Sequence, residues 1–248
     1  MPIWAQAGLW GLLGSSALIV GAALAYLIKL PKRVIAGIMA FGCGVLMSAV
    51  AYDLISEGFD QGGLWPIIGG ALVGSAAYTL ANWLVSKRGG KHRKRSGDQL
   101  KSGGSGLAIA VGSLLDGIPE SIVLGASLLG GGGVGAAMVA AIILSNLPEG
   151  LSSAIGMKNA GHSKAYVLGM WASIAVLSAL AALLGAALLG DASPWVIATV
   201  NAVAAGALLT MIADTMIPEA VEDEPHGTGA LVVIGLLVAF ALSHGTGG

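Results

Sequence analysis

The stretch AYVLGMWASIAVLSALAALLGAALLG, residues 165–190, decides the fold class. It contains no charged residue, and its only hydroxyl groups are those of Tyr166, Ser173 and Ser178. A helix needs roughly 20 mostly apolar residues to cross the hydrocarbon core of a bilayer. The stretch is longer than that, and it lacks the two-residue alternation of a transmembrane β-strand. It therefore predicts a membrane-spanning α-helix.

The rest of the chain has the same character. Of its 248 residues, 56% are hydrophobic and only 10% are charged, whereas soluble domains carry about 25% charged residues. We expect spans at residues 8–30, 34–57, 63–86, 106–129, 133–157, 164–189, 194–219 and 228–244. The sequence thus predicts an all-α membrane protein with about eight transmembrane helices, forming one transmembrane domain over residues 1–248.

The basic residues predict an orientation for these helices. All 12 Lys and Arg residues fall in or beside the first, third and fifth connections between the expected spans. Most lie in residues 87–105, which we interpret as a flexible, basic, cytoplasmic loop between helices 3 and 4. Basic loops stay on the cytoplasmic side. We therefore expect a protein of the cell (inner) membrane with both termini outside.

Two neighbouring spans carry acidic residues at mid-depth, where charge is costly and usually functional. The fourth span contains DGIPES at residues 116–121, and the fifth contains SNLPEG at residues 145–150. Both motifs hold a Pro-Glu pair at the same position, and the two spans run in opposite directions. They therefore form an inverted pair, an arrangement that surrounds the substrate site in many transporters.

The spacing within each motif groups oxygen ligands on one face of a helix. Asp116 and Glu120 are four residues apart, as are Ser145 and Glu149, with Asn146 one position further round. Each proline also frees or tilts the backbone carbonyl one turn earlier. Because such all-oxygen clusters suit hard divalent cations, we expect these residues to bind a metal ion. The alternative for each motif is a packing kink beside a satisfied core acid.

A second inverted pair lies at the ends of the second and seventh spans. Residues 44–57 and 206–219 both begin with Gly and end with Glu. We therefore expect inverted repeats, with helices 1–3 and 6–8 around helices 4–5. The acids of this pair would line a transport pathway: Asp53 and Glu57 at its outer mouth, and Asp214 and Glu219 at its inner exit. The alternative is that they are ordinary interfacial acids.

With these motifs, the chain resembles the ZIP family of divalent-metal transporters over nearly its whole length. That family has eight helices, outward termini, a variable cytoplasmic loop after helix 3 and a His-Asn-x-Pro-Glu-Gly motif on helix 4. Asp116 stands where that motif has its first His. The resemblance implies metal ligands on helices 4, 5 and 2. They are Asp116 and Glu120, then Ser145, Asn146 and Glu149, and finally Met47, with Ser48 as the alternative at that position.

Departures from the family pattern bear on the identity of the metal. Asp116 and Ser145 replace the histidines of the two motifs, and Gly117 replaces an asparagine. Oxygen ligands favour manganese, ferrous iron or magnesium, whereas imidazole ligands suit zinc. We expect one bound ion rather than two, and the transported metal to be zinc, manganese, iron(II) or a similar divalent ion.

Other classes of function are disfavoured. The net charge of −1 suggests no nucleic-acid partner, and the sequence has no P-loop motif, so we expect no ATP site, no prosthetic group and no catalytic residues. The main prediction is a divalent-cation transporter in the lipid bilayer, whose glycine-rich faces would permit a homodimer. Two alternatives stay open: an intramembrane carboxylate-dependent hydrolase, and a proton-coupled carrier of an organic solute.

Overall fold

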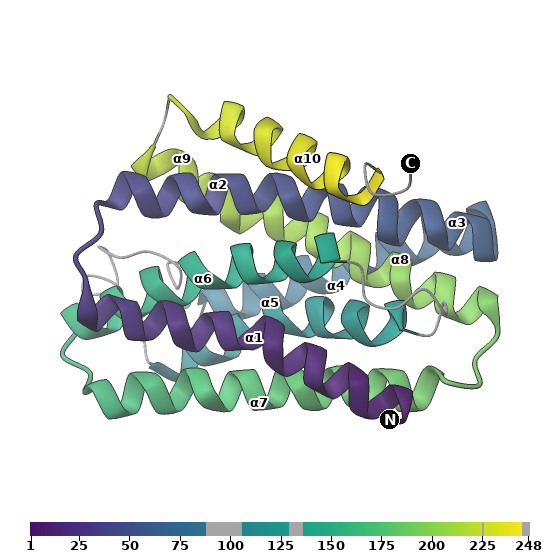
Figure 1. Cartoon of the computed structure of the whole chain (residues 1–248), viewed down its shortest axis with the longest axis horizontal. Coiled ribbons are helices and arrows are strands. Elements are labelled where there is room, and N and C mark those ends of the chain that lie inside the picture. The colour runs from purple at the N-terminus through teal and green to yellow at the C-terminus, as the bar shows by residue number, and fades with distance from the viewer. Residues whose placement is uncertain (88–105, 129–135, 225, 245–248) are drawn as a thin grey trace.

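The computed structural model describes residues 1–87, 106–128, 136–224 and 226–244, and over these residues it contains only helices and their connections (Figure 1). The helices are α1 (Ile3–Leu27), α2 (Lys32–Ala49), α3 (Glu57–Gly62), α4 (Leu64–Val85), α5 (Gly106–Ser127), α6 (Ala136–Asn159), α7 (Lys164–Leu189), α8 (Pro194–Met211), α9 (Ile217–Asp223) and α10 (Thr228–His244). Two π-helical segments, η1 (Val50–Ser56) and η3 (Ile212–Met216), continue α2 into α3 and α8 into α9.

Prolines, serines and glycines set the ends of these helices. Pro2 and Pro31 precede α1 and α2, and the side chain of Ser163 caps α7 by accepting a hydrogen bond from the backbone of Tyr166. The turn from α3 to α4 is made by Gly63 with φ of +78°, a conformation that costs glycine little. The first helix covers residues 3–27 rather than the expected 8–30. It begins directly after Pro2 and ends before Leu30, since a residue before proline disfavours helix.

Six helical segments in the described part of the chain are long and apolar enough to cross a membrane: Ile3–Leu27, Lys32–Gly62, Leu64–Val85, Met138–Asn159, Lys164–Leu189 and Pro194–Asp223. They identify an all-α integral membrane protein. The fourth and eighth expected spans are helices α5 and α10 but are not among these six, and α10 has only 17 residues. The expected loop at 87–105 lies outside the described residues except for Lys87.

Helix contacts divide the described chain into two groups. The first bundle consists of α1, α5, α6 and α7, in which α1 packs on α6 and α7, and α5 packs on α7. The second bundle consists of α2, α4, α8 and α10, in which α2 packs on α10 and α4 on α8. The bundles meet mainly where α2 contacts α6 and where α5 contacts α8 and α4. Both Pro-Glu motifs therefore belong to the first bundle.

Reciprocal pairs of glycines bring helices into close contact. A Cβ atom on Gly74 of α4 would lie 1.9 Å from the carbonyl oxygen of Val203, and one on Gly206 of α8 would lie 2.0 Å from that of Ala71. Two more reciprocal pairs have similar geometry: Gly44 and Gly235 between α2 and α10, and Gly21 and Gly150 between α1 and α6. Small residues allow such close approach of membrane helices.

Basic groups gather at one end of the molecule. Lys158 Nζ donates a hydrogen bond to the carbonyl of Ala25 at 3.3 Å and lies 5.0 Å from the ring centroid of Tyr26. At the same end, Arg33 Nε lies 3.8 Å from Glu224 Oε2, just after α9. Helix α3, the start of α1 and the end of α10 lie at the opposite end (Figure 1).

Candidate cation site

The polar side chains of the two Pro-Glu motifs are all buried, with no more than 5% of their surface exposed. They are Asp116, Glu120 and Ser121 on α5, and Ser145, Asn146 and Glu149 on α6. Both helices continue through their internal prolines, Pro119 and Pro148. A buried polar group is costly unless it has a partner, so the partners of these side chains indicate what the site can do.

Glu120 and Ser145 join the two motifs. The hydroxyl of Ser145 lies 3.1 Å from Glu120 Oε1 and 3.0 Å from the carbonyl oxygen of Ile142. A serine hydroxyl has one hydrogen and two lone pairs, so it can donate to either oxygen and can also offer a lone pair to a cation. The structure therefore brings these two predicted ligands into direct contact.

Asp116 is held from the second bundle. The hydroxyl of Tyr78 on α4 donates to Asp116 Oδ1 at 2.5 Å, and both side chains are buried. Sequence reasoning missed Tyr78 because it lies inside an apolar span. The one available signal is general: a tyrosine buried in an apolar span must find a partner for its hydroxyl.

The remaining predicted ligands have different surroundings. Asn146 Nδ2 donates to the carbonyl of Gly14 on α1 at 3.2 Å, so its amide oxygen remains an acceptor. Glu149 is buried one turn beyond Ser145 on α6. Met47 is partly buried and packs against the apolar core.

The backbone near Pro148 faces α2. Pro148 has no N–H to donate to the carbonyl of Leu144, one turn earlier. A Cβ atom added to Gly42 would lie 3.0 Å from that carbonyl oxygen, which places the carbonyl against α2 at the boundary between the two bundles. That this carbonyl is free to bind a cation stays a prediction.

Several buried hydroxyls have no hydrogen-bond partner among the described protein groups. They belong to Tyr26, Ser113, Ser153 and Ser178. Ser178 Oγ on α7 lies 3.1 Å from the position of a Cβ atom on Gly117, next to Asp116. The sequence predicts mainly packing for the sixth span, and the structure places this serine of the span beside the motif on α5. Unpaired buried hydroxyls are uncommon in folded proteins.

The expected pathway acids lie away from these motifs. Asp53 is partly buried in η1, and Glu57 at the start of α3 is exposed and accepts a hydrogen bond from Gln61 at 3.1 Å. Asp214 in η3 is exposed, and Glu219 in α9 is partly buried. Helices α3 and α9, which carry Glu57 and Glu219, lie at opposite ends of the molecule (Figure 1).

The described residues contain no group of three or more His, Cys, Asp or Glu side chains arranged to hold a metal ion. Two of the buried carboxylates instead accept hydrogen bonds from Tyr78 and Ser145. In the described arrangement, a cation would therefore need neutral oxygen ligands beside one or two carboxylates.

The sequence matches no protein-family model and no curated protein. The likeness to the ZIP family therefore rests on the motifs and their order along the chain.

Proposed function

We propose that the protein is an atypical relative of the ZIP family and transports a divalent cation across the cell membrane. The observation that carries this proposal is the direct contact between Glu120 and Ser145, which joins two buried Pro-Glu motifs from neighbouring helices. Buried acids within membrane spans commonly mark ion pathways. Oxygen ligands favour hard cations such as manganese, ferrous iron and magnesium, and zinc stays among the candidates.

The hydrogen bonds at the site suggest how a cation would be accommodated. Tyr78 and Ser145 donate to Asp116 and Glu120, and a positive ion would take over that role. Ser145 and Ser178 could then turn their lone pairs towards the ion, because a hydroxyl both donates and accepts. Carboxylates, hydroxyls and amide oxygens together would supply the mixed oxygen ligands that divalent ions accept.

We further propose that helices 1–3 and 6–8 are inverted repeats around helices 4–5. The π-helical segments support this, because η1 and η3 each begin six residues after the matched glycines Gly44 and Gly206 (50 − 44 and 212 − 206). The helix contacts support it as well. If the repeats match α1 with α7, α2 with α8, α4 with α10 and α5 with α6, then the contact of α2 with α10 corresponds to that of α8 with α4. The contact of α1 with α6 likewise corresponds to that of α7 with α5, and all four pairs are in contact. Isolated π-helical turns are frequent at functional sites.

In this proposal the ion enters past Asp53 and Glu57, binds between α5 and α6, and leaves past Asp214 and Glu219. The first bundle carries the binding residues and rocks against the second bundle. The division of helix contacts into two bundles supports such a movement, and transporters built from repeats commonly use it.

The proposed orientation predicts which connections are accessible from each side. In a Cys43→Ala background, Lys29→Cys should lie inside and Asp191→Cys outside, because basic connections face the cytoplasm. In right-side-out vesicles, a membrane-impermeant maleimide should label Asp191→Cys at once. It should label Lys29→Cys only after permeabilisation. The reverse pattern would contradict the orientation.

Tyr78→Phe should strengthen cation binding. The substitution keeps the aromatic ring and removes the hydroxyl that competes with a cation for Asp116. A net hydrogen bond is worth about 1 kcal/mol, so the KM for uptake should fall roughly fivefold. Tyr166→Phe, at an exposed position on α7, serves as the control. An unchanged or raised KM in Tyr78→Phe would show that the hydroxyl does not compete with the ion.

A proton-coupled carrier of an organic solute is the second candidate. Buried acids of membrane spans also form proton relays, and Asp116 and Glu120 each accept a hydrogen bond from a hydroxyl group. Uptake into proteoliposomes, measured with competing divalent ions and with and without a pH gradient, separates the two functions. Cation transport requires saturable uptake that other divalent ions inhibit, whereas solute uptake insensitive to metals would favour the second candidate.

A further inference from the structure

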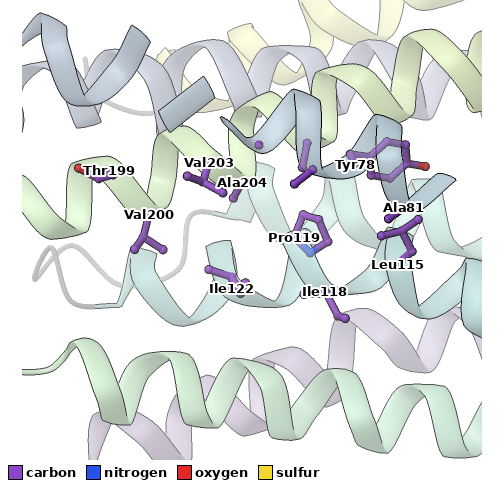
Figure 2. A pocket seen from close by; sticks show the side chains of 13 residues that line it. Tyr78, Ala81, Leu115, Ile118, Pro119, Ile122, Thr199, Val200, Val203 and Ala204 are labelled. Carbon is purple, nitrogen blue, oxygen red and sulfur yellow. The ribbon is translucent and has the colours of Figure 1, made fainter. Parts of the chain in front are cut away.

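An apolar cavity of about 490 Å³ lies between α4, α5 and α8, where the two bundles meet. Figure 2 shows the side chains that surround it, including Tyr78 and Ala81 on α4, Pro119 and Ile122 on α5, and Val200 on α8. Its volume is within the roughly 300–1,000 Å³ of sites that bind small molecules. It is separate from the hydrogen bond between Glu120 and Ser145, which joins α5 to α6.

The cavity opens at mid-span. Two of its lining residues, Ala77 and Ile118, are exposed. Ala77 lies near the middle of α4 (Leu64–Val85), and Ile118 near the middle of α5 (Gly106–Ser127). Because the middle of a membrane span is surrounded by hydrocarbon, the opening faces lipid chains rather than water.

The lining offers no free polar group that would select a polar ligand. Among the lining side chains, only Tyr78 and Thr199 carry a hydroxyl. The hydroxyl of Tyr78 donates to Asp116, and that of Thr199 donates to the carbonyl of Trp195 at 2.8 Å. The other lining side chains are aliphatic or glycine, so an occupant would be held by apolar contacts alone.

We propose that this cavity is a binding site for one acyl chain of a membrane lipid. The chain would enter from the bilayer between Ala77 and Ile118 and lie against Pro119 and the ring of Tyr78. An empty space of this size forfeits van der Waals contacts along its walls, and lipid is the apolar molecule present at the depth of the opening. The cavity shares Tyr78 and Pro119 with the candidate cation site, but this proposal does not depend on cation transport.

A photoreactive lipid tests this site directly. We would place the purified protein in nanodiscs containing a phosphatidylcholine with a diazirine in the middle of one acyl chain. After illumination, mass spectrometry would locate the adducts. They should be several-fold enriched at Ile118, Ile122 and Val200 over the exposed residues Val176 and Leu180 of α7.

A variant with a filled cavity provides the comparison. Ala77→Phe with Ala81→Phe adds two rings on the face of α4 that lines the cavity, and adducts at Ile118, Ile122 and Val200 should fall to the level found on α7. Ala76→Phe with Leu80→Phe is the matched control, one residue earlier on the same helix and outside the cavity. The control should keep the enrichment.

Three results would overturn the proposal. They are adducts spread evenly over the lipid-facing residues, an enrichment that persists in the filled variant, and cross-links between two copies of the chain at these positions in place of lipid adducts. If the α4 variant is not monodisperse, Val200→Trp fills the cavity from α8 instead. In that variant, adducts at Ile118 and Ile122 should fall to the level found on α7.

Discussion

Glu120→Gln is expected to abolish uptake of divalent cations while leaving the protein folded. Glutamine has nearly the shape of glutamate and can still accept the hydrogen bond from Ser145, but it lacks the negative charge. Removing one partner of a buried charge pair costs about 3–5 kcal/mol, so cation affinity should fall by more than about 100-fold. Glu149→Gln should cause a comparable loss, because Glu149 lies one turn beyond Ser145 on α6.

Uptake into proteoliposomes, together with size-exclusion chromatography of the purified variants, measures both parts of this prediction. Asp191→Asn is the matched control, since Asp191 is an exposed acid in the connection between α7 and α8. It should transport as well as the wild type. Wild-type uptake rates in both Glu120→Gln and Glu149→Gln would rule out the proposed site.

Gly74→Ala is expected to destabilise the protein by up to about 2 kcal/mol, although it adds a single methyl group. The new Cβ atom would lie 1.9 Å from the carbonyl oxygen of Val203, whereas carbon and oxygen atoms in contact are about 3.3–3.6 Å apart. Helices α4 and α8 would have to separate by more than about 1 Å. Overpacking of this kind costs about 1–3 kcal/mol, which exceeds the roughly 1 kcal/mol that alanine gains over glycine in a helix.

Gly69→Ala is the matched control for this substitution. Gly69 lies on the same helix. Apart from its chain neighbours and the nearby backbone of its own helix, no heavy atom lies within 4 Å of a Cβ atom placed there. The control should be neutral or slightly stabilising. The melting temperatures of the two variants in detergent, measured from the fraction of protein that stays monodisperse on heating, should therefore differ. Equal melting temperatures for Gly74→Ala and Gly69→Ala would contradict the described packing of α4 on α8.

The sequence predicts the helices well because the length and apolarity of each run between polar connections are local features of the chain. The helix expected at 164–189 has those bounds in the structure, and the expected span at 194–219 is helical throughout. The sequence also identifies matching Gly-to-Glu spacings in the second and seventh spans. It gives no sign that η1 and η3 widen the helix there, because a π-helical segment depends on the packing around it.

The site is less predictable because its contacts join distant parts of the chain. Helical spacing places Asp116 and Glu120 on one face, but it does not reveal which residue of another helix faces them. Tyr78 and Ser178 both lie within apolar spans, and only the packing of α4 and α7 brings them beside the motif on α5. The many glycines indicate close packing, yet the sequence does not pair Gly74 with Gly206.

Equilibrium binding of a divalent cation to the purified protein tests the central claim most directly. The claim is that the acids of α5 and α6 hold the transported ion between the Pro-Glu motifs. Manganese and zinc would each be titrated into the wild type and into the double variant Glu120→Gln with Glu149→Gln, and the bound metal measured by mass spectrometry. We predict one ion per wild-type chain and none in the folded double variant. Equal binding by both proteins, or no binding of either metal to the wild type, would contradict the account.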